Sequence, residues 1–522
     1  MKVTPTVMDR VLSEPRTEQP PNSPDGAGAP RTEPAATNAA ANLAQNWWKI
    51  GDATVLLVWI CITNFTIRYH EKWADEAQAW LIARDLDLRT IWFHELRYEG
   101  TPGVWHTILW VAQHVFHARY SAIGYIGLAF ATSGLAFMLL KAPFPRPLRW
   151  MLAFTYFMVY QYAVIARHYT LFPLFAFAAA HFLSDLERPE RITLVLVLLA
   201  NLTTHGSILA ICFGIAYALR ILKAWPTLNG GTRRRFVLCV GVMLLTFLCL
   251  FIVLKPPPDV EALNSTQKMT HQIMVGYFLN AISGPFFDYA LPSAIFLFLA
   301  GLWCLWRKEF LVFFLPLLLL IPFYVYVRGW PHQQGTIFLA VIAAIWIAWP
   351  KNGEQKSFSQ QERLAYNGMI ALLACLFAYQ AWDAAVIIKH DYKFPYSGAE
   401  DAANYLKSVQ ADRGPIFGYL YGSVGVQAYF DHNILANYPT AYFHHSTTSL
   451  AAKLDSDELK AANPEYLLVP SWSDPDRAYR ELYRPMMDGL GYTLVHVSDG
   501  YLLTKRGWKD RQVYFIFRRV TP

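Results

Sequence analysis

Long apolar stretches separated by short polar segments fill residues 52–388 of the chain. Runs of about 20 apolar residues are long enough to cross the hydrocarbon layer of a bilayer. The pattern predicts about eleven membrane-spanning helices, at residues 52–68, 120–140, 149–166, 169–185, 191–204, 206–223, 236–254, 288–306, 311–327, 334–350 and 366–388. The expected fold is therefore an α-helical polytopic membrane protein.

Composition supports this expectation. Of 522 residues, 54% are hydrophobic and only 16% are charged, against about 25% charged in soluble domains. The net charge of +7 does not point to nucleic acid, because most Lys and Arg residues fall in short connections between apolar stretches. The six cysteines form no CxxC pair, so we expect neither a disulfide framework nor a zinc knuckle.

The basic residues also predict an orientation. They gather in alternate connections, at Lys141, Arg146, Arg149, Arg188, Arg191, Lys223, Arg233, Arg234, Arg235, Arg307, Lys308, Lys351, Lys356 and Arg363. Cytoplasmic loops are enriched in Lys and Arg, so these connections and the N-terminal tail are expected in the cytoplasm. The assignment requires that segment 103–118 does not span. This segment is rich in His and Trp, which suits a helix lying in the interface; a span there would invert everything after it.

Three regions follow along the chain. Residues 1–48 are rich in Pro, Ala, Asn and Thr and are predicted to form a disordered cytoplasmic tail, followed by an apolar segment that acts as an uncleaved signal anchor. Residues 49–390 form the transmembrane module, with a first outer loop at 69–119 that contains interfacial helices. Residues 391–522 are predicted to form a small α/β domain outside the cytoplasm.

The C-terminal region carries short alternating patterns. We expect a helix at 401–409 and strands at 416–420, 466–469 and 492–497. Residues 501–505 are predicted to pair with the last of these strands as a hairpin, turning at Asp499-Gly500.

Two adjacent carboxylates, Asp75 and Glu76, follow the first predicted span directly. An amphipathic helix is predicted here, with Asp75, Gln78, Ala79 and Ile82 on one face. Asp75 is also a good helix cap, and Gln78 follows it much as in a capping box. A cap and a reactive carboxylate are compatible roles. Further along, an aromatic residue, Glu, Gly and Pro precede Trp in the segment Tyr98–Trp105.

These motifs resemble the GT-C glycosyltransferases, in particular the bacterial branch related to protein mannosyltransferases and lipid A aminoarabinose transferases. The resemblance covers roughly residues 50–350. Later outer turns at 166–169, 204–206 and 328–333 are similar to motifs of the same group. Thr101 stands where many relatives have His, Asn64 lies in the first span, and loop 255–287 carries no familiar motif, which leaves the donor and acceptor open.

The resemblance implies a hexosyl- or pentosyltransferase. It would move a sugar from a polyprenyl-phosphate donor to an acceptor hydroxyl of a glycan, lipid or protein, with inversion, at the outer face of the cell inner membrane. The implied catalytic residues are Asp75, which would be the base, and Glu76. The implied donor phosphate site consists of Arg167, Tyr169, His205, Arg328 and His332, and the implied acceptor loop of Glu99, Thr101 and Trp105.

The topology supports a shared site independently, because these ionisable residues and His168 map to one membrane face. Ionisable groups at membrane depth are costly and are usually functional or paired. The alternative is that Arg167 and Arg328 simply extend to the interface.

Two histidine groups have other interpretations. His106, His114 and His117 share one side of a helix and, with His94 or Glu99, could bind a divalent cation, although interfacial histidines also serve as plain polar anchors. His444-His445 is predicted to lie in a solvated loop. No metal site is assigned.

Two other functions compete with sugar transfer. A transporter or flippase of a lipid-linked glycan would show paired halves with interrupted helices, and we see no such duplication in the sequence. An O-antigen-type polymerase or ligase would place its Arg and His in large late loops.

Overall fold

The structure is a computed structural model that describes residues 35–260, 270–351, 353–445, 456–503, 505 and 509–520. The chain divides into two compact units, Met1–Gly51 and Asp52–Pro522. In the first unit, the described residues belong to the beginning of helix α1 (Ala35–Tyr69). The predicted disordered tail is therefore helical from residue 35 onward, and its residues 1–34 lie outside the described residues.

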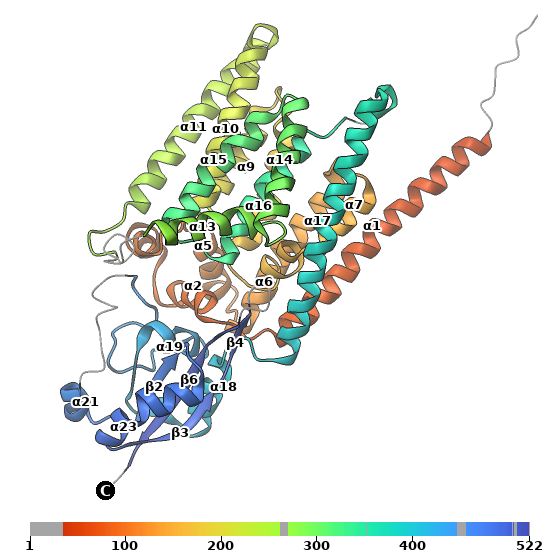
Figure 1. The fold of residues 1–522 in the computed structure, drawn as a ribbon. Helices are drawn as coiled ribbons and strands as arrows, with labels where there is room; N and C mark the ends of the chain where they lie inside the picture. The colour runs from red at the N-terminus through yellow and green to blue at the C-terminus, as the bar shows by residue number, and fades with distance from the viewer. Residues whose placement is uncertain are drawn as a thin grey trace, which may run out of the picture. The chain divides into compact units, whose positions relative to one another are not determined.

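The second unit contains a group of long apolar helices (Figure 1). Among the described residues, five helices are long and apolar enough to cross a membrane: α1, α6 (Ile123–Lys141), α10 (Thr204–Ala224), α11 (Gly230–Leu254) and α17 (Gln360–Lys393). Shorter apolar helices are α14 (Ala290–Trp306), α15 (Phe310–Tyr326) and α16 (Pro331–Ile347). The fold is thus that of a helical membrane protein, and the count of spans stays a prediction.

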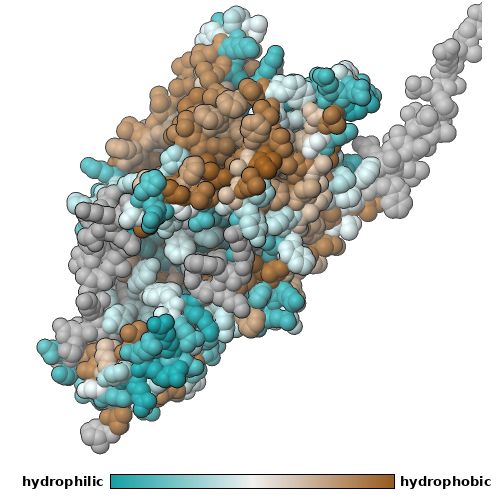
Figure 2. Space-filling model, in the orientation of Figure 1, coloured by the Kyte–Doolittle hydropathy of each residue, from teal (hydrophilic) through white to brown (hydrophobic). Residues whose placement is uncertain are grey.

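The surface of these helices is suited to lipid. Figure 2 shows hydrophobic residues spread over the helical part, whereas the C-terminal domain is mostly hydrophilic on the same face. Helix α11 is the most apolar of the five, yet only 11% of its most hydrophobic 18-residue stretch is buried. Leu238, Leu245 and Phe251 are among its exposed side chains. A continuous apolar surface of this kind marks a contact with a membrane or partner.

The third predicted span, 149–166, is not a continuous helix. Helix α7 covers Arg146–Ala153, a π-helical turn covers Phe157–Gln161, and turns follow. The Thr155 hydroxyl donates to the Leu152 carbonyl at 2.8 Å, which offers the backbone an alternative to helix. Residues 155–166 are all buried, and irregular backbone at membrane depth is tolerated only where protein or water covers it.

The other predicted spans correspond to helices with shifted ends. A 3₁₀ turn (His168–Leu171) precedes α8 (Phe172–Phe182), and α9 covers Pro189–Ala200. The outer loop without a recognised motif contains α13 (His271–Ser283).

The first outer loop is largely helical. It contains α2 (Ala74–Asp85), α3 (Leu88–Thr90), a π-helical turn (Ile91–Glu95), α4 (Leu96–Glu99) and α5 (Val104–His114). The 11 residues of α5 reach roughly 16 Å at 1.5 Å per residue, about half the hydrocarbon thickness. Helix α5 is thus too short to span, as the interfacial interpretation of 103–118 requires.

The C-terminal domain is built around a four-stranded sheet with the order β1-β2-β6-β3. Its strands are β1 (Ile416–Gly418), β2 (Tyr466–Ser471), β3 (Tyr492–Ser498) and β6 (Val513–Arg519). Strands β1 and β2 are parallel, and β6 is antiparallel to both β2 and β3. The helices are α18 (Ala399–Ser408), α19 (Leu420–Gln427), α21 (Ser456–Ala462), α22 (Pro475–Ala478) and α23 (Arg484–Gly489).

The predicted hairpin at Asp499-Gly500 is wrong. Strand β3 pairs with β6, whereas β4 (Tyr501–Leu503) leaves the sheet and pairs with β5 (Lys509–Arg511). A Cβ at Gly500 would lie 2.4 Å from the Gly398 nitrogen. The glycine therefore permits a close crossing over the start of α18 rather than a tight hairpin turn.

Candidate functional site

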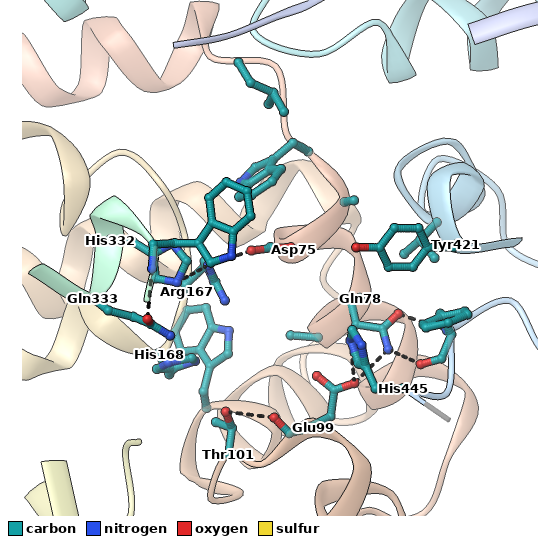
Figure 3. A pocket seen from close by; sticks show the side chains of 18 of the residues that line it. Asp75, Gln78, Glu99, Thr101, Arg167, His168, His332, Gln333, Tyr421 and His445 are labelled. Carbon is teal, nitrogen blue, oxygen red and sulfur yellow. Dashed lines mark hydrogen bonds and ion pairs between the residues drawn. The ribbon is translucent and has the colours of Figure 1, made fainter. Parts of the chain in front are cut away.

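A cavity of about 380 Å³ lies where the first outer loop, the ends of the apolar helices and the C-terminal domain meet (Figure 3). Ligand pockets commonly have volumes of about 300–1,000 Å³. It is lined by Trp73, Ala74, Asp75, Gln78, Ala79, Glu99, Thr101, Trp105, His106, Arg167, His168, Trp330, His332, Gln333, Tyr421, Val424, Phe443, His445, Trp472, Leu502 and Gln512.

Asp75 lies in the first turn of α2. The helix begins at Ala74 after Trp73, so Asp75 is not its cap, and its side chain reaches the cavity together with Gln78 and Ala79. The Asp75 carboxylate is paired with Arg167 at 2.7 Å, and the two side chains are 35% and 18% exposed. Asp75, Gln78 and Ala79 of the predicted face line the cavity, whereas Ile82 of the same face is fully buried and does not.

Arg167 joins two predicted motifs. Its Nη1 contacts both the Asp75 carboxylate and Nε2 of His332, the latter at 3.3 Å. Its guanidinium lies 5.7 Å from the centre of the Tyr169 ring. Within the described residues, Nε and Nη2 of Arg167 form no hydrogen bond. The guanidinium therefore has donors left for an anionic ligand.

Buried histidines surround this pair. His106 and His168 are 2% and 7% exposed, and both line the cavity. Burial lowers the pKa of His106 to about 4; burial, with Arg167 nearby, holds the pKa of His168 well below its ordinary value. Both imidazoles are thus neutral at pH 7. Both nitrogens of His106 and Nε2 of His168 find no hydrogen-bond partner among the described residues, so a ligand could satisfy them.

Glu76 does not face the cavity. It is 1% exposed, and its Oε1 accepts a hydrogen bond from the Ala166 nitrogen at 2.8 Å, one residue before Arg167. Its Oε2 contacts Nε2 of His70 at 3.2 Å, and Nδ1 of His70 contacts Asp391 at 2.9 Å. The expected catalytic carboxylate is instead a buried support for the segment that carries Arg167.

Glu99 marks the far side of the cavity. It accepts a hydrogen bond from Gln78 at 2.9 Å and lies 3.8 Å from Nε2 of His445. Burial raises the pKa of Glu99, and His445 and Gln78 limit the rise. Thr101 and Trp105 also line the cavity, so the structure brings the whole predicted acceptor loop to the site.

The C-terminal domain closes one side of the cavity. The Phe443 nitrogen donates a hydrogen bond to Oε1 of Gln78 at 3.0 Å. This bond attaches the backbone of Phe443 to α2. His444 pairs with buried Glu95 at 3.1 Å. His444 and His445 lie in a loop, as predicted, and their side chains are 29% and 38% exposed, but both face carboxylates, Glu95 and Glu99, of the first outer loop.

Three predicted phosphate contacts do not line the cavity. Tyr169 is buried behind Arg167 and stacks on Tyr162 with ring centres 5.5 Å apart. His205 is 4% exposed in the first turn of α10. Arg328 follows α15 with a φ of 53°, and its side chain is absent from the cavity lining.

The histidine group considered for a metal is dispersed. His114 is exposed and stacks on Trp110 at 4.4 Å, while His106 is buried. Across the described residues, no group of three or more His, Cys, Asp or Glu side chains is arranged to hold a metal ion.

Several residues of the site have no clear sequence signal. Tyr421, Trp472 and Gln512 come from a domain whose packing cannot be read from spacing. His70 and Asp391 stand at the ends of the first and last long apolar stretches, where an ionisable residue is a recognisable signal.

Comparisons with protein-family models and with curated proteins found no match to this chain.

Proposed function

We propose that the chain is a GT-C-type glycosyltransferase that moves a sugar from a polyprenyl-phosphate donor to an acceptor hydroxyl. The observation that carries the proposal is the Asp75–Arg167 pair at 2.7 Å, set among neutral histidines in a cavity at the ends of apolar helices. A carboxylate and a guanidinium that share one cavity supply a base for the acceptor and a counter-charge for the leaving phosphate.

The donor phosphate would bind at Arg167. The unused guanidinium donors suit phosphate oxygens, which Arg can bind bidentately. His332 also lies beside Arg167, and burial, with Arg167 nearby, holds its pKa well below the ordinary value, as for His168. Both imidazoles are therefore neutral at pH 7, and each can donate one hydrogen bond. The polyprenyl chain would leave the cavity along the apolar helices.

Transfer then requires one displacement. The acceptor oxygen forms a bond to the anomeric carbon while the bond from that carbon to the phosphate oxygen breaks. Asp75 takes the acceptor proton, and the leaving polyprenyl phosphate keeps the electron pair beside Arg167. Attack opposite the leaving group inverts the anomeric configuration.

Glu76 has a positioning role in this mechanism. It is buried and holds the Ala166 nitrogen, so it sets the backbone from which Arg167 reaches Asp75. This revises the expectation that both carboxylates of the pair take part in the chemistry.

The placement in the cell is part of the same proposal. About eleven spans, basic connections in the cytoplasm, and the cavity with its covering domain on the outer face of an inner membrane would give access to lipid-linked donors. The positive-inside pattern supports this orientation.

The test is a transfer assay with the purified full chain and labelled polyprenyl-phosphate sugars. Asp75→Asn keeps the shape but cannot accept a proton, and we expect turnover to fall by about 10²–10⁴. Asp85→Asn, at the exposed end of the same helix and outside the cavity, should retain normal turnover. Near-normal transfer by folded Asp75→Asn would remove Asp75 from the base role. Movement of a lipid-linked glycan across vesicles that survives loss of both Asp75 and Arg167 would favour a transporter instead.

A further inference from the structure

Two aromatic rings of the C-terminal domain line the cavity without a part in the chemistry above. Tyr421 and Trp472 are each 48% exposed, and their ring centres lie 5.6 Å apart. Tyr421 also packs edge-on against Phe443 at 5.0 Å. The rings thus form a fixed aromatic platform (Tyr421 and Trp472) with open surface inside a cavity.

The backbone next to the platform is built for close packing. A Cβ at Gly422 would lie 2.3 Å from the Pro470 side chain and 3.1 Å from the Trp472 ring. Only glycine allows α19 to approach the end of β2 this closely. Close packing between α19, which carries Tyr421, and the end of β2, directly before Trp472, therefore positions the two rings.

A buried amide faces the same cavity. Gln512 is 1% exposed and lines the cavity. Its nitrogen donates to the Tyr514 hydroxyl at 2.8 Å, whereas its Oε1 has no hydrogen-bond partner within the described part of the chain. A buried acceptor of this kind is normally satisfied, and a ligand that brings a hydroxyl or N–H donor to this end of the cavity would satisfy it.

Aromatic faces combined with neutral amides fit a sugar ring. The C–H groups of a pyranose lie flat on aromatic surfaces, and its hydroxyls donate to and accept from side chains such as Gln. An isoprenyl chain would leave the Gln512 carbonyl unsatisfied. The chemistry of this end of the cavity therefore favours carbohydrate over lipid.

The position of the aromatic platform relative to Asp75 indicates whether it binds the sugar of the donor or that of the acceptor. In Figure 3, Arg167 and Tyr421 lie on opposite sides of Asp75, and the Tyr421 hydroxyl points toward that carboxylate. In an inverting displacement the acceptor approaches opposite the leaving phosphate. We propose that Tyr421 and Trp472 form the subsite for a sugar ring of the acceptor, which makes the acceptor a glycan or a glycosylated lipid. This inference rests on the proposed function for its assignment to the acceptor.

The first experiment measures binding alone. Saturation-transfer NMR of the full chain in detergent, with the methyl glycosides of glucose, mannose, galactose and N-acetylglucosamine as probes, should detect at least one ligand. Trp472→Ala should weaken that binding about tenfold by removing one stacking face, and Trp472→Phe should restore part of it. Trp382→Ala, which removes a 69% exposed ring on α17 outside the cavity, should bind as wild type. No glycoside binding by wild type, or equal binding by Trp472→Ala, would overturn the subsite.

The second experiment separates donor from acceptor. Binding of polyprenyl phosphate should be lost in Arg167→Ala and retained in Trp472→Ala. During transfer, Trp472→Ala should raise the KM for the acceptor about tenfold with little change in that for the donor. A raised donor KM with an unchanged acceptor KM would assign the ring to the donor and overturn the proposal.

Failure of the two proposals can be told apart. If no donor supports transfer but glycoside binding still depends on Trp472, the glycosyltransferase assignment fails while a carbohydrate subsite stands. If transfer depends on Asp75 but glycoside binding ignores Trp472, the subsite fails and the enzyme assignment stands.

Discussion

Gln78 holds the main chain of Phe443 with both ends of its amide. The Phe443 nitrogen donates to Gln78 Oε1 at 3.0 Å, and Gln78 Nε2 donates to the Phe443 carbonyl and, at 2.9 Å, to Glu99. One side chain of the first outer loop thus binds the C-terminal domain and a carboxylate of the cavity together.

Removing this amide should loosen the domain locally. Gln78→Ala leaves buried backbone groups of Phe443 without partners, which costs about 1–3 kcal/mol. We expect faster hydrogen exchange in the segment around Phe443, with the long helices unaffected. Gln113→Ala, which removes an amide bonded to the Trp80 carbonyl, is the control. Unchanged exchange at Phe443 in Gln78→Ala would contradict this clamp.

Arg167→Lys tests the shape of the cation separately from its charge. Lysine can still neutralise Asp75, but it lacks the remaining guanidinium donors, Nε and Nη2, that are proposed to bind the donor phosphate. In the proposed sugar transfer, turnover should fall about 10²-fold, as for loss of one preorganised donor, and binding of the proposed polyprenyl-phosphate donor should weaken. Arg89→Lys, on an exposed turn of the same loop, should behave as wild type. Equal kinetics of Arg167→Lys and wild type would show that charge alone suffices.

His70 should make stability depend on pH. Burial lowers its pKa, but Asp391 and Glu76 outweigh burial and raise it from 6.5 to about 10. Because the folded state binds the proton more tightly than the unfolded chain, this stabilisation is complete below pH 6.5 and is lost as the pH rises toward 10. The Tm of wild type should therefore fall across this range.

His70→Gln should have a lower Tm at pH 7 and a flatter profile up to pH 10. His114→Gln removes an exposed imidazole and should keep the wild-type slope. The measurement is a thermal melt of the solubilised full chain at several pH values. The same slope in His70→Gln and wild type would refute a charged His70.

Lys505 fastens the β4–β5 side of the C-terminal domain to the helices. It is 6% exposed and lies 3.8 Å from Asp288 and 3.9 Å from Asp383, and its Nζ donates to the Gly284 carbonyl at 2.9 Å. Breaking a buried ion pair on one side costs about 3–5 kcal/mol. Lys505→Ala should lower the Tm and speed exchange in β4.

A matched pair of variants isolates the charge. Lys505→Met combined with Asp383→Asn should recover part of the loss, because fewer buried carboxylates then lack a cation. Lys460→Ala, an exposed lysine of α21, should have no effect. If the double variant is less stable than Lys505→Ala, the ion pairs are not the source of the stabilisation.

Most of the helical fold could be predicted from the long apolar stretches. A segment that crosses a bilayer must satisfy its backbone hydrogen bonds internally, and a helix does so. The exception, 149–166, shows the limit. The stretch is mostly apolar, yet its helix ends at Ala153, and the irregular backbone that follows is tolerated because the protein buries it. Burial of this kind depends on tertiary packing, which hydropathy does not encode. The prediction of a hairpin turn at Asp499-Gly500 was wrong for the same reason, because the close approach of the Gly398 backbone to Gly500 depends on tertiary packing.

The candidate site could be predicted only in part, from residues that lie on one face of a helix or at the same end of the apolar helices. Helical spacing placed Asp75 and Gln78 together, and topology brought Arg167 and His332 to the same end. Helical spacing also separates Asp75 from Glu76, but which of the two carboxylates faces the cavity depends on tertiary packing. Neither helical spacing nor topology could identify His445 as a cavity residue, since its partner Glu99 is distant in sequence.

The link from Glu76 through His70 to Asp391 also bears on how the protein is made. His70 and Asp391 are 321 residues apart, at the ends of α1 and α17. During synthesis the early loop with Asp75 leaves the ribosome long before the helix that completes its support. Chains that stop before α17 would thus carry every residue of the Asp75–Arg167–His332 group without the brace behind it. Nascent or truncated protein should therefore be unable to carry out the proposed sugar transfer until the last long helix is inserted.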